Sequence, residues 1–361
     1  MPRCEFIDDL IPLILDADDH WWPRHFARLA TVSPAWQYYV NKRLYPYPDI
    51  HSFASARLLA DTLMEQPSLA SLVAGISLRP VAKDSSSRRP KPAELKAVRY
   101  LLSLEGLKRI ALGGELAVQT ERFLRLIADP DSLTDLHVDG SALADCLSTR
   151  PSLEWDESLT FSFPALQKLR LTHLELDIIP PSMPHPSSLS TLVLENVHII
   201  SGQLTHLLNG AASLDRLHFT TVDPVGSDEQ LKVVLASCTV GCLHYETLKA
   251  THSNEFVFDL DANCAESLRC LHLDGHFVDL GVLNSVGRLC RNLVELVVSG
   301  RAVRVSSQEW ARFIRSGALS SLRRLGLPSG TNIPPFGLWL SKEVEEIRDA
   351  CASRQVPVVL L

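Results

Sequence analysis

The sequence lacks the short motifs that mark common catalytic and nucleotide-binding sites. It contains no GxxxxGK[ST] phosphate loop, no GxGxxG fingerprint, no HExxH metal motif and no GxSxG nucleophile elbow. Serine, histidine and aspartate are scattered along the 361 residues without a spacing that singles out a catalytic triad. We therefore expect a protein that is not an enzyme and that needs no cofactor.

Long apolar runs and an excess of basic charge are also missing. No run reaches the roughly 18 apolar residues of a membrane-spanning helix, and the first segment, MPRCEFIDDL, has no apolar signal region. No Asn-x-Ser/Thr sequon occurs, and the formal net charge of −7 is opposite in sign to the basic footprint of a nucleic-acid binder. We expect a cytoplasmic or nuclear protein with neither a membrane nor a nucleic-acid partner.

Cysteine is present but scattered, and no disulfide framework is suggested. In a chain of this length without a signal peptide, we expect reduced and mostly buried thiols. Hydrophobic residues make up 46% of the chain and charged residues 21%, so a large core can form. The cysteines are Cys4, Cys146, Cys238, Cys242, Cys264, Cys270, Cys290 and Cys351.

What the sequence does contain is a recurring phrase, Leu-x-x-Leu-x-Leu. Successive copies start 23 to 33 residues apart, a period typical of leucine-rich repeats, in which each repeat supplies one short strand and one helical return. Between copies, segments such as 228–237 and 307–317 have helical periodicity. The copies start at Leu107, Leu133, Leu166, Leu189, Leu214, Val240, Leu268, Leu293 and Leu322.

These patterns predict an α/β fold, a leucine-rich repeat solenoid with a parallel concave sheet and helical returns, preceded by a small all-α module. We expect the module at 1–50, a connecting helix, an irregular first rung and a disordered loop at 51–96, and the solenoid with its C-terminal cap at 97–361. Two excursions, at 150–164 and 177–188, interrupt the repeats. The second contains four prolines, which oppose regular pairing.

Within each phrase the leucines point into the core and the intervening residues face the concave surface. This surface has a basic tilt, which suits an acidic or phosphorylated partner, although an ordinary solvated strand face is at least as good an interpretation. Its candidate partner-binding residues are Arg109, His137, Lys168, Arg170, Arg216, His218, His244, His272, Glu295 and Arg324.

Three consecutive strands place His218, His244 and His272 in one column, with Cys242 and Cys270 two residues earlier on the same face. Several interpretations stay open: a zinc site of two thiolates and two imidazoles, a disulfide, a histidine patch that responds to pH near 6.5, or plain surface polarity. The phrase at Val240 is the weakest copy, and a register slip there would turn Cys242 inward.

The first 45 residues predict three helices. Asp8 is a candidate N-cap before the apolar run 10–15, and the pair Ser33-Pro34 is a typical helix start. Trp36, Tyr39, Val40 and Leu44 then give the third helix one apolar face.

This module resembles an F-box. The usual core, Leu-Pro-x-Glu-Leu-x-x-x-Ile-Leu, is matched by FIDDLIPLIL from Phe6, with Ile7 in place of proline. The family stretch Val-[Cys/Ser]-x-x-Trp is matched by Val32 to Trp36. Together with the repeats, the chain is similar to divergent F-box/leucine-rich repeat proteins of the fungal type.

The resemblance implies a non-catalytic substrate receptor of an SCF-type (Skp–cullin–F-box) ubiquitin ligase. The helical module would bind a Skp-type adaptor and, through it, a cullin ligase, while the concave face binds an unknown protein substrate. The adaptor contacts implied are Phe6, Leu10, Ile14, Leu15, Val32 and Trp36. The alternative is a leucine-rich repeat interaction scaffold or inhibitor with no role in ubiquitination.

Overall fold

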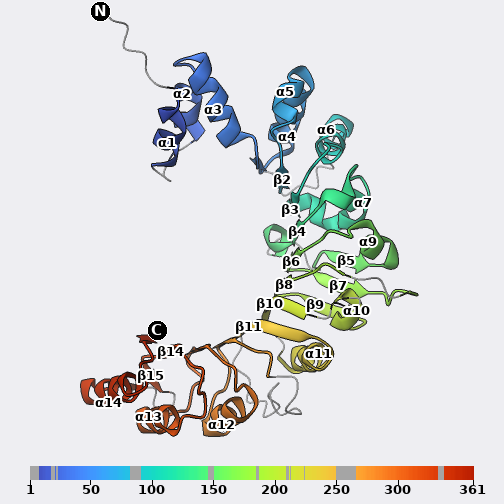
Figure 1. The fold of residues 1–361 in the computed structure, drawn as a ribbon. Coiled ribbons are helices and arrows are strands. Elements are labelled where there is room, and N and C mark those ends of the chain that lie inside the picture. The colour runs from blue at the N-terminus through green and yellow to red at the C-terminus, as the bar shows by residue number, and fades with distance from the viewer. Residues whose placement is uncertain are drawn as a thin grey trace, which may run out of the picture. The chain divides into compact units, whose positions relative to one another are not determined.

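The computed structural model describes residues 8–17, 21, 23–81, 91–144, 150–183, 187–208, 211, 213–222, 224–248, 266–331 and 337–361. Most of the predicted disordered loop, residue 7 and earlier residues, and Cys264 lie outside this part of the chain. The chain divides into two compact units, Met1–Cys146 and Leu147–Leu361, which we call unit 1 and unit 2. Both are mixed α/β structures (Figure 1).

Unit 1 begins with the predicted helices, which we call the helical module (residues 10–44). They are α1 (Leu10–Asp16), α2 (Pro23–Leu29) and α3 (Pro34–Leu44). Ile11, Leu15, Phe26 and Val40 form the buried core of the module, and Trp36 packs against it.

The start of α3 confirms one predicted cap, and the start of α1 corrects another. The Ser33 hydroxyl accepts a hydrogen bond from the Trp36 backbone N–H at 3.3 Å, and Pro34 occupies the first helical position. The residue before α1 is Asp9, not Asp8, and its side chain makes no capping bond. Asp9 already has helical backbone angles, which directs its carboxylate away from the first N–H groups.

The rest of unit 1 is a parallel ladder of strands with helices between them. The predicted strand at 71–78 is shorter than expected, because residues 71–73 continue the turn that ends α5. The strands pair in the order β1, β2, β3, β4. The elements are β1 (Asp49–Ile50), α4 (Phe53–Glu65), α5 (Pro67–Ala70), β2 (Gly75–Leu78), α6 (Pro92–Leu102), β3 (Arg109–Gly113), η1 (Gly114–Gln119), α7 (Thr120–Leu124), η2 (Pro130–Ser132), β4 (Asp135–Asp139) and α8 (Ser141–Ala144).

Unit 2 contains a longer parallel ladder, and every strand in it except the last comes from one copy of the repeated phrase. The strands pair in chain order, each with the next. They are β6 (Lys168–Thr172), β8 (Thr191–Glu195), β10 (Ser213–Thr221), β11 (Thr239–Thr247), β12 (Cys270–Asp274), β13 (Glu295–Ser299), β14 (Arg324–Leu327) and β17 (Val358–Leu360).

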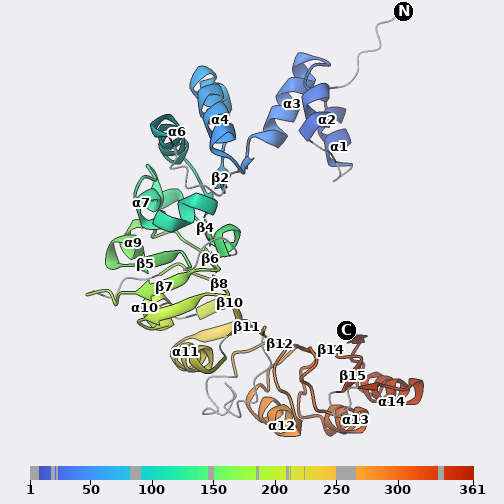
Figure 2. The same ribbon diagram turned by 180° about the vertical axis from the view of Figure 1, so that it is seen from behind.

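Helices are present in the segments of unit 2 for which the sequence predicted them. Figures 1 and 2 show α10 to α13 along one side of the ladder, where the leucines of the phrase are buried. The helices are α10 (Leu204–Leu208), α11 (Pro224–Ser237), α12 (Leu280–Leu289), α13 (Ser307–Ser316) and α14 (Ser341–Ala352), and a short pair, β15 (Gly330–Thr331) and β16 (Gly337–Leu338), precedes α14.

The excursion at 150–164, for which the sequence predicted no element, is regular structure. It contains β5 (Ser152–Trp155) and α9 (Glu157–Ser162), and β5 pairs in parallel with β7 (Glu175–Ile178), which pairs with β9 (His198–Ser201). These strands form a second sheet of three strands in unit 2. In β5 and β7 alternate side chains are buried, so the segment follows a period of two.

Within the described ranges of the chain, no helix combines the length and the apolar composition that crossing a membrane would need.

Candidate functional site

The ladder of unit 2 has one face that carries polar side chains in three rows, which we call the polar strand face. The rows follow from the parallel register, because residues two apart on a strand lie on the same face. The first row is Lys168, Thr191, Arg216, Cys242, Cys270, Glu295 and Arg324; the second is Arg170, Val193, His218, His244, His272, Val297 and Gly326; the third is Thr172, Glu195, Thr220, Glu246, Asp274 and Ser299.

The predicted histidine column is present in the second row. His218 pairs in register with His244, and His244 with His272. The first two rings stack with centroids 4.1 Å apart and planes 2° apart, and the next pair lies at 5.4 Å and 55°. The register therefore does not slip at the weak Val240 copy.

Burial decides the charge state of these imidazoles. Desolvation is the main reason that the pKa of His218 falls from 6.5 to about 4, and the neighbouring His244 lowers it further. The pKa of His244 is lowered too, first by burial and then by His272. Both rings are therefore neutral at pH 7, and His218 takes up a proton only near pH 4, below the expected pH of 6.5.

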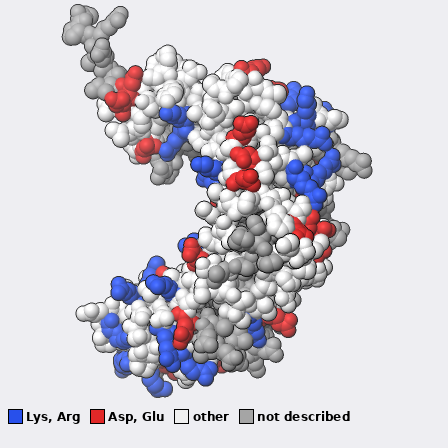
Figure 3. All heavy atoms as spheres, turned by 45° about the vertical axis from the view of Figure 1, so that its right-hand side comes forward, with Lys and Arg blue, Asp and Glu red and all other residues white. Residues whose placement is uncertain are grey.

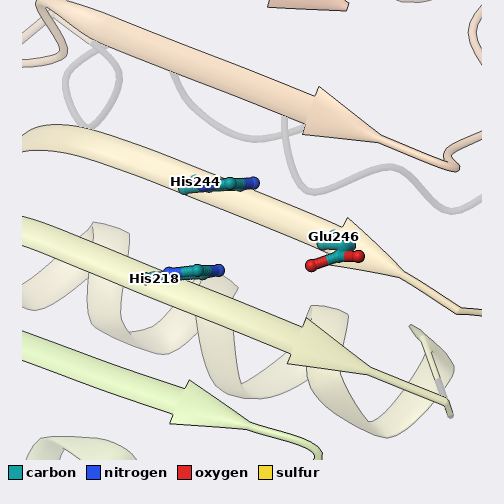
Figure 4. A group of neighbouring side chains, drawn as sticks. All are labelled: His218, His244 and Glu246. Atoms are coloured by element: carbon teal, nitrogen blue, oxygen red, sulfur yellow. The ribbon is translucent and has the colours of Figure 1, made fainter. Parts of the chain in front are cut away.

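The third row brings carboxylates beside the histidines, and these carboxylates were not predicted from the sequence. His218, His244 and Glu246 place one potential ligand atom each within 4.8 Å of the others (Figure 4). Thr220 lies between two of them, since its hydroxyl donates to Glu246 Oε2 at 3.0 Å and lies 3.2 Å from His218 Nε2. The signal was available: Glu246 is two residues after His244 and shares its face by the same period-two rule.

Ion pairs lie on the strands that flank the three histidines on either side. Arg170 donates to both carboxylate oxygens of Glu195 at 2.9 Å. Glu295 forms an ion pair with Arg324 at 3.2 Å, and its Oε1 also lies 3.3 Å from His272 Nε2, so groups from three neighbouring strands meet there. Lys168 and Arg216 are exposed to solvent, as predicted for the first row. Figure 3 shows both acidic and basic side chains on one side of the surface.

The two cysteines of the first row lie in register but are not bonded. Cys242 pairs with Cys270, and both are free thiols, so the disulfide interpretation is wrong. Burial raises the pKa of the Cys242 thiol to about 11, with Cys270 as the next cause. Zinc would have to displace the proton of the Cys242 thiol in order to bind there, and the four-ligand site stays one of the open interpretations.

The candidate residues of unit 1 lie on β3 and β4. Arg109 is exposed and its guanidinium lies 4.6 Å from the centroid of the Tyr47 ring. His137 is half-buried and pairs in register with Ala111. Asp139, also on β4, forms an ion pair with Arg79, with Arg79 Nη1 and Asp139 Oδ2 3.5 Å apart.

The predicted adaptor contacts have different environments within the helical module. Val32 is 63% exposed and Leu10 43%, and Leu13, which the resemblance did not indicate, is 65% exposed. Leu13 follows Leu10 by three residues, so helical spacing alone places the two on one side of α1.

The other implied contacts are less accessible. Leu15 is only 2% exposed and belongs to the core of the module, where it stabilises the helices from inside. Ile14 and Trp36 are half-buried, and Trp36 packs on the same core. Phe6 lies outside the described residues.

Comparison of the chain with protein-family models and with curated proteins gave no match.

Proposed function

We propose that this chain is the substrate receptor of an SCF-type ubiquitin ligase, with an F-box-like helical module and a leucine-rich repeat solenoid. The helical module would bind a Skp-type adaptor, and the polar strand face, as the concave face of the solenoid, would bind a protein substrate. Such a receptor works in the cytoplasm or nucleus and leaves the transfer chemistry to its partners.

The proposal of a leucine-rich repeat solenoid is supported by the match between the repeated phrase and the observed strands. Each copy of Leu-x-x-Leu-x-Leu supplies one strand of a parallel ladder, and the segments between many of them form helices on one side. A fold of this kind leaves a long strand face uncovered by helices, which suits protein binding more than catalysis.

The adaptor part rests on the outward apolar side chains of the helical module, which is the observation that carries the proposal. Leu10, Leu13 and Val32 are exposed although the module has its own buried core. A module of about 40 residues buries little apolar surface by itself, and a partner helix or sheet over these side chains would add to its stability.

Co-purification of the full chain with a Skp-type adaptor tests the proposal. We expect the wild type to retain the adaptor, and Leu10→Asp or Val32→Asp to lose it, because each places a charge in the apolar contact. Leu58→Asp is the matched control, since Leu58 on α4 is 65% exposed and lies outside the module. A folded wild type that retains no adaptor would favour the scaffold alternative.

A further inference from the structure

Three side chains from neighbouring strands converge on the polar strand face. His218 comes from β10, and His244 and Glu246 come from β11, so the backbone ladder fixes their spacing. Figure 4 shows the carboxylate of Glu246 beyond the ring edges of both histidines, on the side to which the rings extend. One ligand atom of each lies within 4.8 Å of the other two.

Thr220 holds this arrangement in place. Its side chain is 8% exposed and lies in register with Glu246 on the adjacent strand. The hydroxyl donates to Glu246 Oε2 at 3.0 Å and contacts His218 Nε2 at 3.2 Å. A buried hydroxyl that orients a carboxylate toward an imidazole is the kind of outer-shell contact found around metal ligands.

Two neighbouring carboxylates at this place would also be stabilised by a bound cation. Glu246 and Asp274 are neighbours in register on β11 and β12. Within the described ranges neither is part of an ion pair, whereas Glu195 is paired with Arg170 and Glu295 with Arg324. Like charges directly opposite each other on adjacent strands destabilise a sheet, and a bound dication would offset this repulsion.

We infer that His218, His244 and Glu246 bind a single divalent transition-metal ion. Two imidazoles and one carboxylate form a donor set that suits zinc, and they disfavour magnesium and calcium, which prefer oxygen ligands alone. Zinc–ligand bonds of about 2.0–2.2 Å require the three ligand atoms to approach each other more closely than 4.8 Å. The rings of His218 and His244 are stacked in parallel, so side-chain rotations would have to turn both toward one point.

The coordination shell of this ion would be incomplete. Three protein ligands leave a fourth tetrahedral position for water or for a donor from another molecule. All three residues are half-buried and not enclosed, so this position opens to solvent on the polar strand face. The inference does not depend on the proposed ligase role; if both hold, the ion lies on the surface offered to the substrate.

The test is zinc affinity of the metal-stripped full chain, measured in competition with a chromogenic chelator, with Co²⁺ as a spectroscopic probe. We expect one equivalent to bind and the Co²⁺ spectrum to report nitrogen and oxygen ligands in a low-symmetry site. His218→Ala, His244→Ala and Glu246→Gln should each lower the affinity by roughly 100-fold or more, and Thr220→Val by roughly tenfold.

Matched controls separate this site from other ligands. His198→Ala removes an exposed histidine of β9 and should leave zinc affinity unchanged. Circular dichroism and a thermal melt verify that each variant is folded, and Glu246→Gln preserves the shape of the side chain if the alanine variants unfold. The inference is overturned if the folded variants bind zinc like the wild type. It is also overturned if Cys242→Ser together with Cys270→Ser abolishes binding.

Discussion

At the scale of single residues, the buried imidazole of His276 makes stability depend on pH. It is 7% exposed, and its ring centroid lies 4.1 Å from that of Tyr245. Burial lowers its pKa from 6.5 to about 4. As the pH falls from 6.5 toward 4, the unfolded chain takes up a proton that the folded chain does not, so the free energy of unfolding decreases.

The expected loss from His276 alone is up to about 3 kcal/mol, because each unit of pKa shift corresponds to about 1.4 kcal/mol. Urea unfolding between about pH 7 and pH 4.5 measures it. His276→Gln cannot titrate and should flatten the decline, although His218 and His244 contribute with the same sign. An equally steep decline in the variant would contradict this assignment.

Tyr245 carries a second residue-scale prediction. Its hydroxyl donates to Asp228 Oδ1 at 2.7 Å, and both side chains are buried. Tyr245→Phe removes one hydrogen bond from a buried carboxylate, and we expect it to lower the free energy of unfolding by about 1–3 kcal/mol. Tyr38→Phe, at an exposed position of α3, is the control and should change stability little in the same urea titration. Equal effects of the two changes would show that the buried hydrogen bond contributes nothing.

At the scale of elements, the end of strand β12 depends on a glycine. Gly275 has φ of +72°, and a Cβ there would lie 2.3 Å from the carbonyl oxygen of Thr247 on the neighbouring strand. Gly275→Ala combines backbone strain with a backbone clash, so we expect a loss of at least about 1–3 kcal/mol in thermal or urea unfolding.

Gly106 provides the matched comparison for Gly275. Its φ is +74°, but a Cβ there meets nothing within 4 Å. Gly106→Ala should therefore cost less than Gly275→Ala, by the energy of the clash. If both variants lose the same stability, the close approach of the two strands is not what requires glycine at position 275.

The strands show how far the fold could be predicted from the sequence. The repeated phrase predicted the strands of the main ladder, because leucine spacing fixes both the face and the register, and the column from His218 to His272 followed directly. Strand β5 was missed, because four residues with two buried side chains are too short a pattern to distinguish from a loop. Its partners lie more than 20 residues away in the chain, and no local signal indicates that pairing.

The candidate site was predicted only in part. The histidines were found by reading one position of each phrase, while Glu246 and Thr220 lie one step further along the same face and were left out. The distinction between Val32, which is exposed, and Leu15, which is buried, also needed the structure, because it depends on how the helices of the module pack and not on the motifs.

At the scale of the whole molecule, the proposed adaptor binding and the proposed zinc binding belong to separate surfaces. The helical module carries exposed apolar side chains, and the polar strand face carries imidazoles, carboxylates and arginines. Each unit has its own core, so a substitution in one surface should leave the other functional. We expect Val32→Asp to retain the zinc affinity of the wild type, measured by chelator competition. A loss of zinc binding in this variant would contradict the independence of the two surfaces.

The proposed function requires that the chain enter a cullin ligase through its helical module. The most direct measurement is the mass of the complex formed when the full chain is mixed with a Skp-type adaptor and a cullin, determined by size exclusion with light scattering. We expect one copy of each protein in the complex for the wild type and for Leu58→Asp, and no assembly for Val32→Asp. A folded wild type that stays separate from the adaptor, or a Val32→Asp chain that assembles as the wild type does, would contradict it.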